Sequence, residues 1–491
     1  MLTLHPWITT LLYLADLAIR LGLSIRVIMR KRPYGESLAW LVVILTLPLV
    51  GALAYLLFGE NRLGDIRAER AEKRMGAYHK WLGTLRNRYQ SPAHPFNDSY
   101  YTPVLYHSSH LTGLPVLPFN SVQIFAGTEE FFHNLTQDIN QAEKSCHLEF
   151  YIWEEKGLVN EIAAALIRAA ERGVVVRILI DSLGSREFLK GKMIGKMRRA
   201  GIQVVETLPV GILRIIFRRI DLRNHRKIVI IDGKIGYTGS QNLVDPRFFK
   251  QNKRVGQWQD VMLRMQGPIV EALNGTFVSD LLMETGMKPE SAYEIQQMTE
   301  PAPADNTERQ TCIQLVPSGP GFSPTTIHDI LLTAIYTARR ELILTTPYFV
   351  PDQAFINALT SASQRGVEVT LILPEKNDSL LVALASRSRY EELAAAGIRI
   401  MFFKKGFLHA KTINIDNKFS LIGTVNFDMR SFWLNFEVSL FIFDTDFTRQ
   451  LRSLQEKYKK SAYPLDINLH KKRSKVKQFL ENIALLVSPL L

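Results

Sequence analysis

Cysteine is almost absent from this chain, which contains two in 491 residues. Cys146 and Cys312 cannot build a disulfide framework, and neither stands in a spacing typical of metal ligands. We therefore expect both to be buried core residues without a special role. Lys and Arg are also absent ahead of the first apolar stretch, which argues against a cleaved secretory signal.

Acidic residues are too few to balance the basic ones, because 47 Asp and Glu oppose 60 Lys and Arg and leave a formal net charge of +13. This excess favours polyanionic partners, either nucleic acid or anionic lipid. Hydrophobic residues make up 46% of the chain, so a large core can form and general disorder is excluded. The length suggests roughly two to four structural units, or one pseudo-symmetric pair with appendages.

Charge is missing altogether from residues 37–58, a run of 22 residues with Trp40 and Tyr55 near its ends. Such a run is long enough to cross a bilayer, and aromatic side chains favour its two interfaces. We expect a transmembrane helix here. Residues 7–29 are also apolar, but Asp16 and Arg20 interrupt them at a spacing that lets the two side chains pair on one helix face. They are either a first span, which would complete a transmembrane helical hairpin, or a helix lying in the membrane interface.

The cluster of basic residues after residues 37–58 is longer than the one before them, which favours a cytoplasmic location for the main domain. From about residue 119, strand-like apolar runs alternate with helical segments, which predicts an α/β fold. After a Pro-, Ala- and acid-rich tract the same order of segments starts again, so the chain carries an internal duplication of two similar packed domains. The expected limits are a membrane anchor at 1–60, a connector at 61–118, a first domain at 119–298, a linker at 299–310, a second domain at 311–465 and a basic, amphipathic end at 466–491.

Each duplicated unit contains one His-x-Lys-x4-Asp motif, and a Gly and an Asn follow each His at the same offsets of 14 and 17 residues. Two matches inside a duplication are a far stronger signal than one. The motifs are made of His225, Lys227 and Asp232 and of His409, Lys411 and Asp416.

The spacing within each motif suits phosphodiester chemistry. On a strand, His and Lys two residues apart face the same way. Lysines neutralise the anionic oxygens, one neutral His attacks phosphorus, and a protonated His donates to the leaving oxygen. No cluster has metal-ligand spacing, so we expect no metal and no cofactor, with the cationic clamp in their place. Ser240, Asn242, Thr424 and Asn426 are expected to add hydrogen bonds.

Four carboxylates are expected to support these residues. Asp232 and Asp416 precede apparent turns at strand ends, so we expect them to hold structure and not to react. Each imidazole also needs an acceptor on its other nitrogen. Asp260 follows His225 by 35 residues and Glu437 follows His409 by 28, each on the expected strand after its motif, and we expect both to orient an imidazole.

The doubled motif resembles the phospholipase D superfamily and, within it, the bacterial cardiolipin synthases. The resemblance rests on residues 30–60, 149–155, 225–242 and 409–437 and covers nearly the whole chain. It implies two phospholipase D-like α/β sandwich domains in the bacterial cytoplasmic (inner) membrane, acting on phosphatidylglycerol and anionic lipids and not on nucleic acid. It further implies that a phosphatidyl-histidine forms, that a second phosphatidylglycerol accepts the group to give cardiolipin and glycerol, and that His225 is the nucleophile.

Three alternatives stay open from the residues alone. Another enzyme of the superfamily, a hydrolytic phospholipase D or a phosphatidylserine synthase, would carry the same motifs. A nuclease would share the basic charge, and a membrane scaffold could keep the fold without activity. An apolar, arginine-rich stretch before His225, at 206–224, is expected to dip into lipid headgroups or to pack as a buried helix. The end of the chain is expected to be a surface helix, a solvated tail or a packing helix.

Overall fold

The computed structural model describes residues 6–30, 34–47, 49–59, 65–89, 100–209, 222–288 and 311–487. These residues form two units, of which the first holds the helices before residue 69 and the second holds the sheet and the remaining helices. The expected linker at 299–310 and most of the stretch before His225 lie outside the described residues.

Three helices make the first unit: α1 (Pro6–Met29), α2 (Tyr34–Thr46) and α3 (Val50–Phe58). Val27, Ile44 and Tyr55 form a small buried core between them. The charged residues of α1 have a structural use, because Asp16 pairs with Arg20 and also accepts a hydrogen bond from the backbone N–H of Leu49 at 3.2 Å. The pairing predicted from their spacing is confirmed.

The prediction of one continuous helix over residues 37–58 is wrong. Helix α2 ends at Thr46, Leu49 has a φ of +54°, and α3 begins at Val50. The sequence between the two helices contains a proline, whose lack of a backbone N–H interrupts helical hydrogen bonding. Within the described ranges no helix combines the length and apolarity needed to cross a bilayer, so the expected transmembrane hairpin is not supported.

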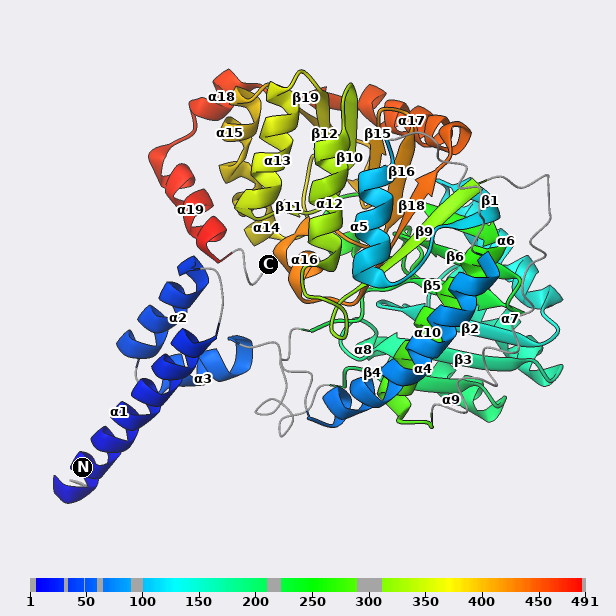
Figure 1. Ribbon diagram of the computed structural model, residues 1–491, viewed down its shortest axis with the longest axis horizontal. Helices are drawn as coiled ribbons and strands as arrows, with labels where there is room; N and C mark the ends of the chain where they lie inside the picture. Colours follow the sequence, from blue (N-terminus) through cyan, green and yellow to red (C-terminus); the bar gives the residue numbers. More distant parts are fainter. Residues whose placement is uncertain are drawn as a thin grey trace. The chain divides into compact units, whose positions relative to one another are not determined.

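A single sheet of 15 strands runs through the second unit in the order β19-β13-β12-β10-β15-β16-β18-β9-β1-β8-β6-β5-β2-β3-β4 (Figure 1). The first half contributes β1 (Leu117–Phe125), β2 (Ser145–Phe150), β3 (Val175–Asp181), β4 (Gln203–Thr207), β5 (Ile228–Ile231), β6 (Ile235–Gly239) and β8 (Met262–Gln266). The second half contributes β9 (Thr311–Ser318), β10 (Glu341–Thr345), β12 (Glu368–Pro374), β13 (Arg399–Phe403), β15 (Thr412–Ile415), β16 (Phe419–Gly423), β18 (Glu437–Phe443) and β19 (Ala462–Pro464).

The two halves repeat one topology, which confirms the predicted duplication. In each half three parallel strands, β2-β3-β4 or β10-β12-β13, pair through their first member with an antiparallel hairpin, β5-β6 or β15-β16. The halves join where β1 pairs with β9 in antiparallel fashion. The outcome is the mixed α/β architecture that the alternating segments predicted.

Helices cover both faces of each half. In the first half α6 (Thr128–Gln141) and α7 (Val159–Glu171) lie on one face and α10 (Pro268–Thr285) on the other. In the second half α12 (Thr326–Thr337) and α13 (Gln353–Gln364) lie opposite α17 (Thr445–Lys460). The strands are apolar throughout because alternate residues enter different cores, as Val229 and Ile228 do. Cys146 and Cys312 are both buried, as expected.

The stretch expected to connect anchor and domains carries α4 (Asp65–Tyr89) and α5 (Thr102–Thr112). Trp81 and Leu85 of α4 belong to the core that contains α10, and Val104 of α5 packs with α12. The remaining helices are α8 (Arg186–Lys190), α9 (Lys192–Arg199), α14 (Leu380–Ser388), α15 (Tyr390–Ala395), α16 (Met429–Trp433), α18 (Ile467–Lys471) and α19 (Lys475–Leu486).

Candidate active site

Both motif histidines lie just before a hairpin strand, and each is fixed by backbone hydrogen bonds to the opposite half. His225 precedes β5, and its N–H donates to the carbonyl of Phe436 at 2.9 Å. His409 precedes β15, and its N–H donates to the carbonyl of Gln259 at 2.8 Å. Next to His409, the short strands β7 (Trp258–Gln259) and β14 (Phe407–Leu408) pair in parallel. The backbone therefore brings the two motifs together across the junction of the halves.

Each imidazole is held by a carboxylate from the other half. Nδ1 of His225 lies 2.9 Å from Oε2 and 3.1 Å from Oε1 of Glu437. Nδ1 of His409 lies 2.6 Å from Oδ1 of Asp260. Each carboxylate stands beside the histidine of the other half and not beside the one it follows in sequence, so the two carboxylates are exchanged between the halves. A carboxylate at Nδ1 selects the tautomer whose Nε2 carries the lone pair.

Hydroxyl groups from the motifs' own halves hold the two carboxylates. Ser240 Oγ donates to Oδ1 of Asp260 at 2.6 Å and accepts the N–H of Val261 at 3.0 Å. Thr424 Oγ1 donates to Oε2 of Glu437 and accepts the N–H of Val438 at 2.9 Å. The two arrangements are equivalent. Ser240 and Thr424 therefore act on the site through a carboxylate, which in turn fixes the histidine of the opposite half.

Two fully buried lysines supply positive charge at the same place. Lys227 Nζ donates to the carbonyl of His225 at 2.7 Å, and Lys411 Nζ donates to the carbonyl of His409. Burial lowers the pKa of Lys227 to about 8 and that of Lys411 to about 7, although Glu437 and Asp260 oppose this shift. The positive charge of Lys227 lowers the pKa of Lys411 further.

Burial also keeps both imidazoles neutral near pH 7. It lowers the pKa of His225 to about 4 and that of His409 to about 3, while the paired carboxylates and the lysines pull in opposite directions. Burial raises the pKa of Glu437 and of Asp260, but the nearby imidazole and lysines outweigh it and hold both pKa values below their usual range. The site thus contains two buried, neutral imidazoles between two lysines and two carboxylates.

The motif aspartates lie at the far ends of β5 and β15 from the histidines. Asp232 accepts backbone N–H groups of Lys144 at 2.7 Å and Ser145 at 2.9 Å, at the start of β2. Asp416 accepts those of Arg340 and Glu341 at 2.7 Å, at the start of β10. These carboxylates fix the register of the strands next to the motif hairpins, and the structure does not bring them to the imidazoles.

The two motif asparagines shape the loops beside the site. Asn242 Oδ1 accepts the N–H of Ile152 at 3.1 Å, and Asn426 Nδ2 donates to Ser431 Oγ at 3.4 Å. The preceding glycines allow close contact with the next strand, since a Cβ on Gly239 would lie 2.3 Å from the carbonyl of Val261 and one on Gly423 would lie 2.5 Å from that of Val438. This explains the repeated Gly at that offset.

Sequence reasoning missed several residues around the imidazoles. The ring of Tyr151 meets that of His225 edge to face at 5.2 Å, and the ring of Trp258 lies 4.1 Å from that of His409. Arg226 is fully buried, donates to the carbonyls of Glu437 and Ser318 at 3.0 Å, and pairs with Asp280, so it ties the halves together. The second motif has Ala410 at the equivalent place. The sequence did offer a signal for the two aromatic residues, because Tyr151 lies in the segment 149–155 that carries the family resemblance and Trp258 lies two residues before Asp260.

No group of three or more His, Cys, Asp or Glu side chains in the described ranges is arranged to hold a metal ion.

Comparison with known proteins gives matches along the whole chain. Residues 135–259 and 331–458 match the family described as cardiolipin synthase, PLD-like domain, and residues 19–60 match the phospholipase D-nuclease N-terminal family. The two copies of the first match fall one in each half.

Curated relatives and one solved structure extend these matches. A protein named cardiolipin synthase A from Yersinia pseudotuberculosis is 42% identical over 494 residues, covering 100% of this chain and 99% of the relative. One of the same name from Edwardsiella ictaluri is 42% identical over 96% of each chain. The crystal structure of a phosphatidylserine synthase from Haemophilus influenzae matches 79% of this chain and 100% of its own with a TM-score of 0.60 at 13% identity, which supports the fold alone.

Proposed function

The chain belongs to the bacterial cardiolipin synthases of the phospholipase D superfamily, and we propose that it moves a phosphatidyl group from one phosphatidylglycerol to another. The products are cardiolipin and glycerol. The observation that carries this proposal is the crossed pair of imidazoles, each held by a buried carboxylate of the other half with a lysine beside it. One neutral imidazole can attack phosphorus while the other handles the proton of the glycerol oxygen.

The reaction runs in two displacements. In the first, Nε2 of His225 attacks phosphorus, the bond from phosphorus to the glycerol oxygen breaks, and His409 gives that oxygen a proton, so that glycerol leaves. In the second, His409 takes the proton of a primary hydroxyl on the second phosphatidylglycerol, whose oxygen attacks phosphorus and breaks the bond to His225. Both imidazoles return to their starting states, and no nucleotide or redox partner is consumed.

Substrate binding supplies the protonated acid that this sequence needs. Beyond burial, the charges of the two lysines lower the pKa of both imidazoles. An anionic phosphodiester between Lys227 and Lys411 would offset those charges and raise the pKa of His409, with Asp260 stabilising the imidazolium. Lys227, Lys411, Asn242 and Asn426 are proposed to bind the phosphoryl oxygens, where the lysines stabilise the charge that develops during transfer.

Glu437 and Asp260 are proposed as positioning residues. Each fixes one ring in the tautomer that presents Nε2 to phosphorus or to the glycerol oxygen, and Thr424 and Ser240 fix the carboxylates in turn. Asp232 and Asp416 are proposed to act only through the strand starts that they hold.

We also propose domain limits of 119–298 and 311–465 for the two phospholipase D-like domains, with 61–118 and 299–310 linking them to their neighbours. The enzyme is proposed to work on anionic lipid at the cytoplasmic face of the bacterial inner membrane. The basic charge of the chain supports this location, because an anionic leaflet attracts Lys and Arg at its surface.

Purified protein in phosphatidylglycerol micelles tests the proposal. Cardiolipin and glycerol should appear in equal amounts without added nucleotide or metal. Phosphatidic acid as the only lipid product would mean that water is the acceptor and that the chain is a hydrolase of the same superfamily. Formation of phosphatidylserine in a parallel reaction with added serine would instead favour a phosphatidylserine synthase.

A further inference from the structure

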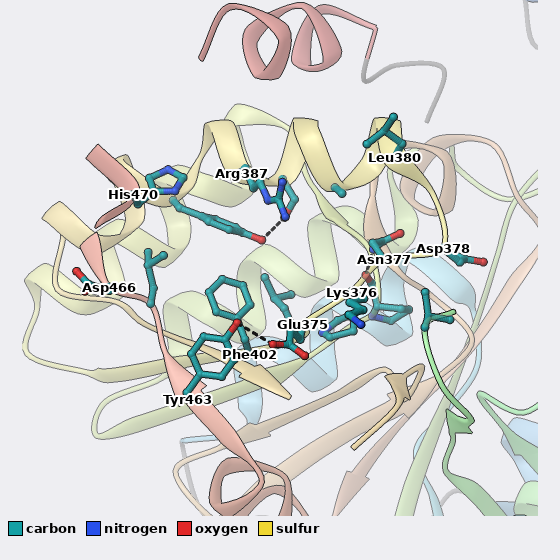
Figure 2. Close-up of a pocket in the computed structure, with 18 of the residues that line it drawn as sticks. Glu375, Lys376, Asn377, Asp378, Leu380, Arg387, Phe402, Tyr463, Asp466 and His470 are labelled. Carbon is teal, nitrogen blue, oxygen red and sulfur yellow. Dashed lines mark hydrogen bonds between the residues drawn. The ribbon is translucent and has the colours of Figure 1, made fainter. Parts of the chain in front are cut away.

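A cavity of about 980 Å³, apart from the imidazoles, is lined mainly by the second half and also by Lys253, Arg254 and Val255 of the first. Helix α14 forms one wall with Leu380 and Arg387, and Phe402 of β13 and Tyr463 of β19 face it from the edge of the sheet (Figure 2). The Phe402 and Tyr463 rings lie 5.6 Å apart and make an aromatic floor. A cavity of this volume is large enough for a phospholipid headgroup with the first part of its chains.

The cavity lining carries more positive charge than its own carboxylates can pair. Its three carboxylates are already engaged: Glu375 accepts the hydroxyl of Tyr463 at 3.2 Å, Asp378 pairs with Lys250, and Asp466 caps α18. Arg473 is held by two glutamates outside the cavity. The other cations of the lining have no ion pair with a described residue, and they are Lys253, Arg254, Lys376, Arg387 and Lys477. A ligand that suits this cavity is therefore an anion.

The rim of the cavity is apolar and exposed, which points to an amphiphilic ligand. Leu380 is 73% exposed, Leu469 on α18 is 70% exposed, and Phe479 on the adjoining α19 is 64% exposed. Further exposed apolar residues on α14 and α19 are Leu381, Val476, Leu480, Ile483 and Leu486. Glu481 and Ala484 face inward on α19, so this helix is amphipathic, and lysines surround its start. Apolar side chains with a basic border are typical of surfaces that dock on anionic bilayers.

One end of the cavity approaches the candidate active site. Asp378, which lines it, accepts a hydrogen bond from Lys250 at 2.8 Å. Lys250 Nζ lies 5.1 Å from the ring of Trp258, which contacts His409. The side chains of Lys250 and Trp258 thus connect Asp378 of the cavity lining to the imidazole proposed to act on the glycerol oxygen.

We propose that this cavity is a second phospholipid site, in which Arg387 and the neighbouring lysines hold the headgroup phosphate of an anionic phospholipid whose chains leave over Leu380 and Leu469. The inference rests on the proposed function, since transfer between two phosphatidylglycerol molecules requires a place for the second one. The cation that carries the assignment is Arg387, which reaches from α14 over the aromatic floor (Figure 2).

Photolabelling of the full chain tests this site without relying on turnover. The His225→Ala protein in neutral detergent is irradiated with phosphatidylglycerol that carries a diazirine in one acyl chain, and labelled peptides are mapped by mass spectrometry. Label should appear on the peptides that carry Leu380 and Leu469. Arg387→Glu should reduce that label about tenfold or more, as expected when a charge-assisted hydrogen bond is replaced by repulsion. Arg399→Glu, at an exposed position of β13 outside the cavity, should leave it unchanged.

Three outcomes would overturn the proposal. Equal labelling of the Arg387→Glu and parent proteins would mean that Arg387 does not bind the headgroup phosphate. Lys376→Glu serves as a second variant, and thermal unfolding checks that both variants are folded. Equal labelling by a matched phosphatidylcholine probe would reduce the site to a bare apolar surface. Displacement of the lipid by millimolar inorganic phosphate would assign the cavity to free phosphate. Absence of cardiolipin formation by the unmodified enzyme, with cavity labelling intact, would count against the proposed function and not against this site.

Discussion

Glu437→Gln should disable His225, and Asp260→Asn should disable His409, although each pair of residues comes from different halves of the chain. The prediction follows from the two hydrogen bonds at Nδ1, 2.9 Å for the first pair and 2.6 Å for the second. An intact fold is expected in both variants, because the amides match the carboxylates in shape. The loss should therefore fall on the step that each imidazole performs.

The surroundings of the two carboxylates predict unequal losses. A hydrogen bond to a charged group contributes about 1.5–3 kcal/mol, which is about 10- to 100-fold in rate. Both oxygens of Glu437 accept hydrogen bonds, from His225, Thr424 and Asn435, so a Gln amide must turn its NH2 toward a donor. Such a clash selects the wrong tautomer, and in a Ser-His-Asp triad it costs about 10⁴-fold. Oδ2 of Asp260 has no hydrogen-bond partner among the described residues, so Asn can place its NH2 there. We expect about 10³- to 10⁴-fold loss for Glu437→Gln and about 10- to 100-fold for Asp260→Asn.

A substrate that needs no acid separates the two roles. In phosphatidyl-p-nitrophenol the leaving group departs without a proton, so the first-turnover burst of p-nitrophenol should be largely restored in His409→Ala and in Asp260→Asn. Neither His225→Ala nor Glu437→Gln should recover. Asp446→Asn, an exposed carboxylate on α17, is the control and should behave as the unmodified protein does.

The crossed arrangement makes a claim that does not depend on which histidine is the nucleophile. Glu437→Gln must resemble His225→Ala, and Asp260→Asn must resemble His409→Ala, on both substrates. If Glu437→Gln shared the profile of His409→Ala instead, each carboxylate would serve the histidine of its own half, and the reasoning from the structure would fail.

Three further predictions follow from the site. The lysines act as cations and their pKa values are lowered to about 7 and about 8, so kcat/KM for phosphatidylglycerol should fall as pH rises through that range, and Lys411→Arg should move this limb upward in a pH–rate profile. Thr424→Val should lower turnover about 10-fold because it disturbs Glu437 and so His225, and Ser240→Ala should disturb Asp260 and so His409. With phosphatidyl-p-nitrophenol, Ser240→Ala should therefore recover and Thr424→Val should not. Asp232→Ala leaves backbone N–H groups of Lys144 and Ser145 unpaired, so the free energy of unfolding should drop by about 2–4 kcal/mol in urea titrations, while KM of the folded fraction stays unchanged.

The motif geometry was predictable because it is local. His and Lys two residues apart in an extended segment are expected to share a face, although the structure places both just before the strand. Asp232 and Asp416 follow their strands with positive φ, as turn residues do. The duplication was visible because both halves keep the same offsets. The exchange of carboxylates was not predictable, because sequence distance says nothing about which half contributes the neighbouring strand. It depends on backbone pairing between Asn224 and Phe436.

The first unit shows where composition misled. Residues 37–58 satisfy the apolar length of a span, yet the chain breaks near Leu49 and the two short helices pack on α1. A hydropathy criterion adds up the apolar character of a window of residues, so it does not register that a proline inside the window lacks the backbone N–H needed for a helical hydrogen bond. The role of Arg226 was also hidden, since a buried arginine can be recognised only when its partner Asp280 and the carbonyls it contacts are in view.

Trapping the covalent intermediate tests the central claim most directly. His409→Ala is mixed briefly with phosphatidyl-p-nitrophenol, whose leaving group needs no acid, the reaction is quenched without acid, and the protein mass is measured before and after digestion. The account predicts one added phosphatidyl group, carried by the peptide that contains His225 and missing from His225→Ala. Label on the peptide containing His409 in the His225→Ala protein would reverse the order of the two histidines, whereas cardiolipin formation with no trapped group in any variant would contradict a two-displacement mechanism.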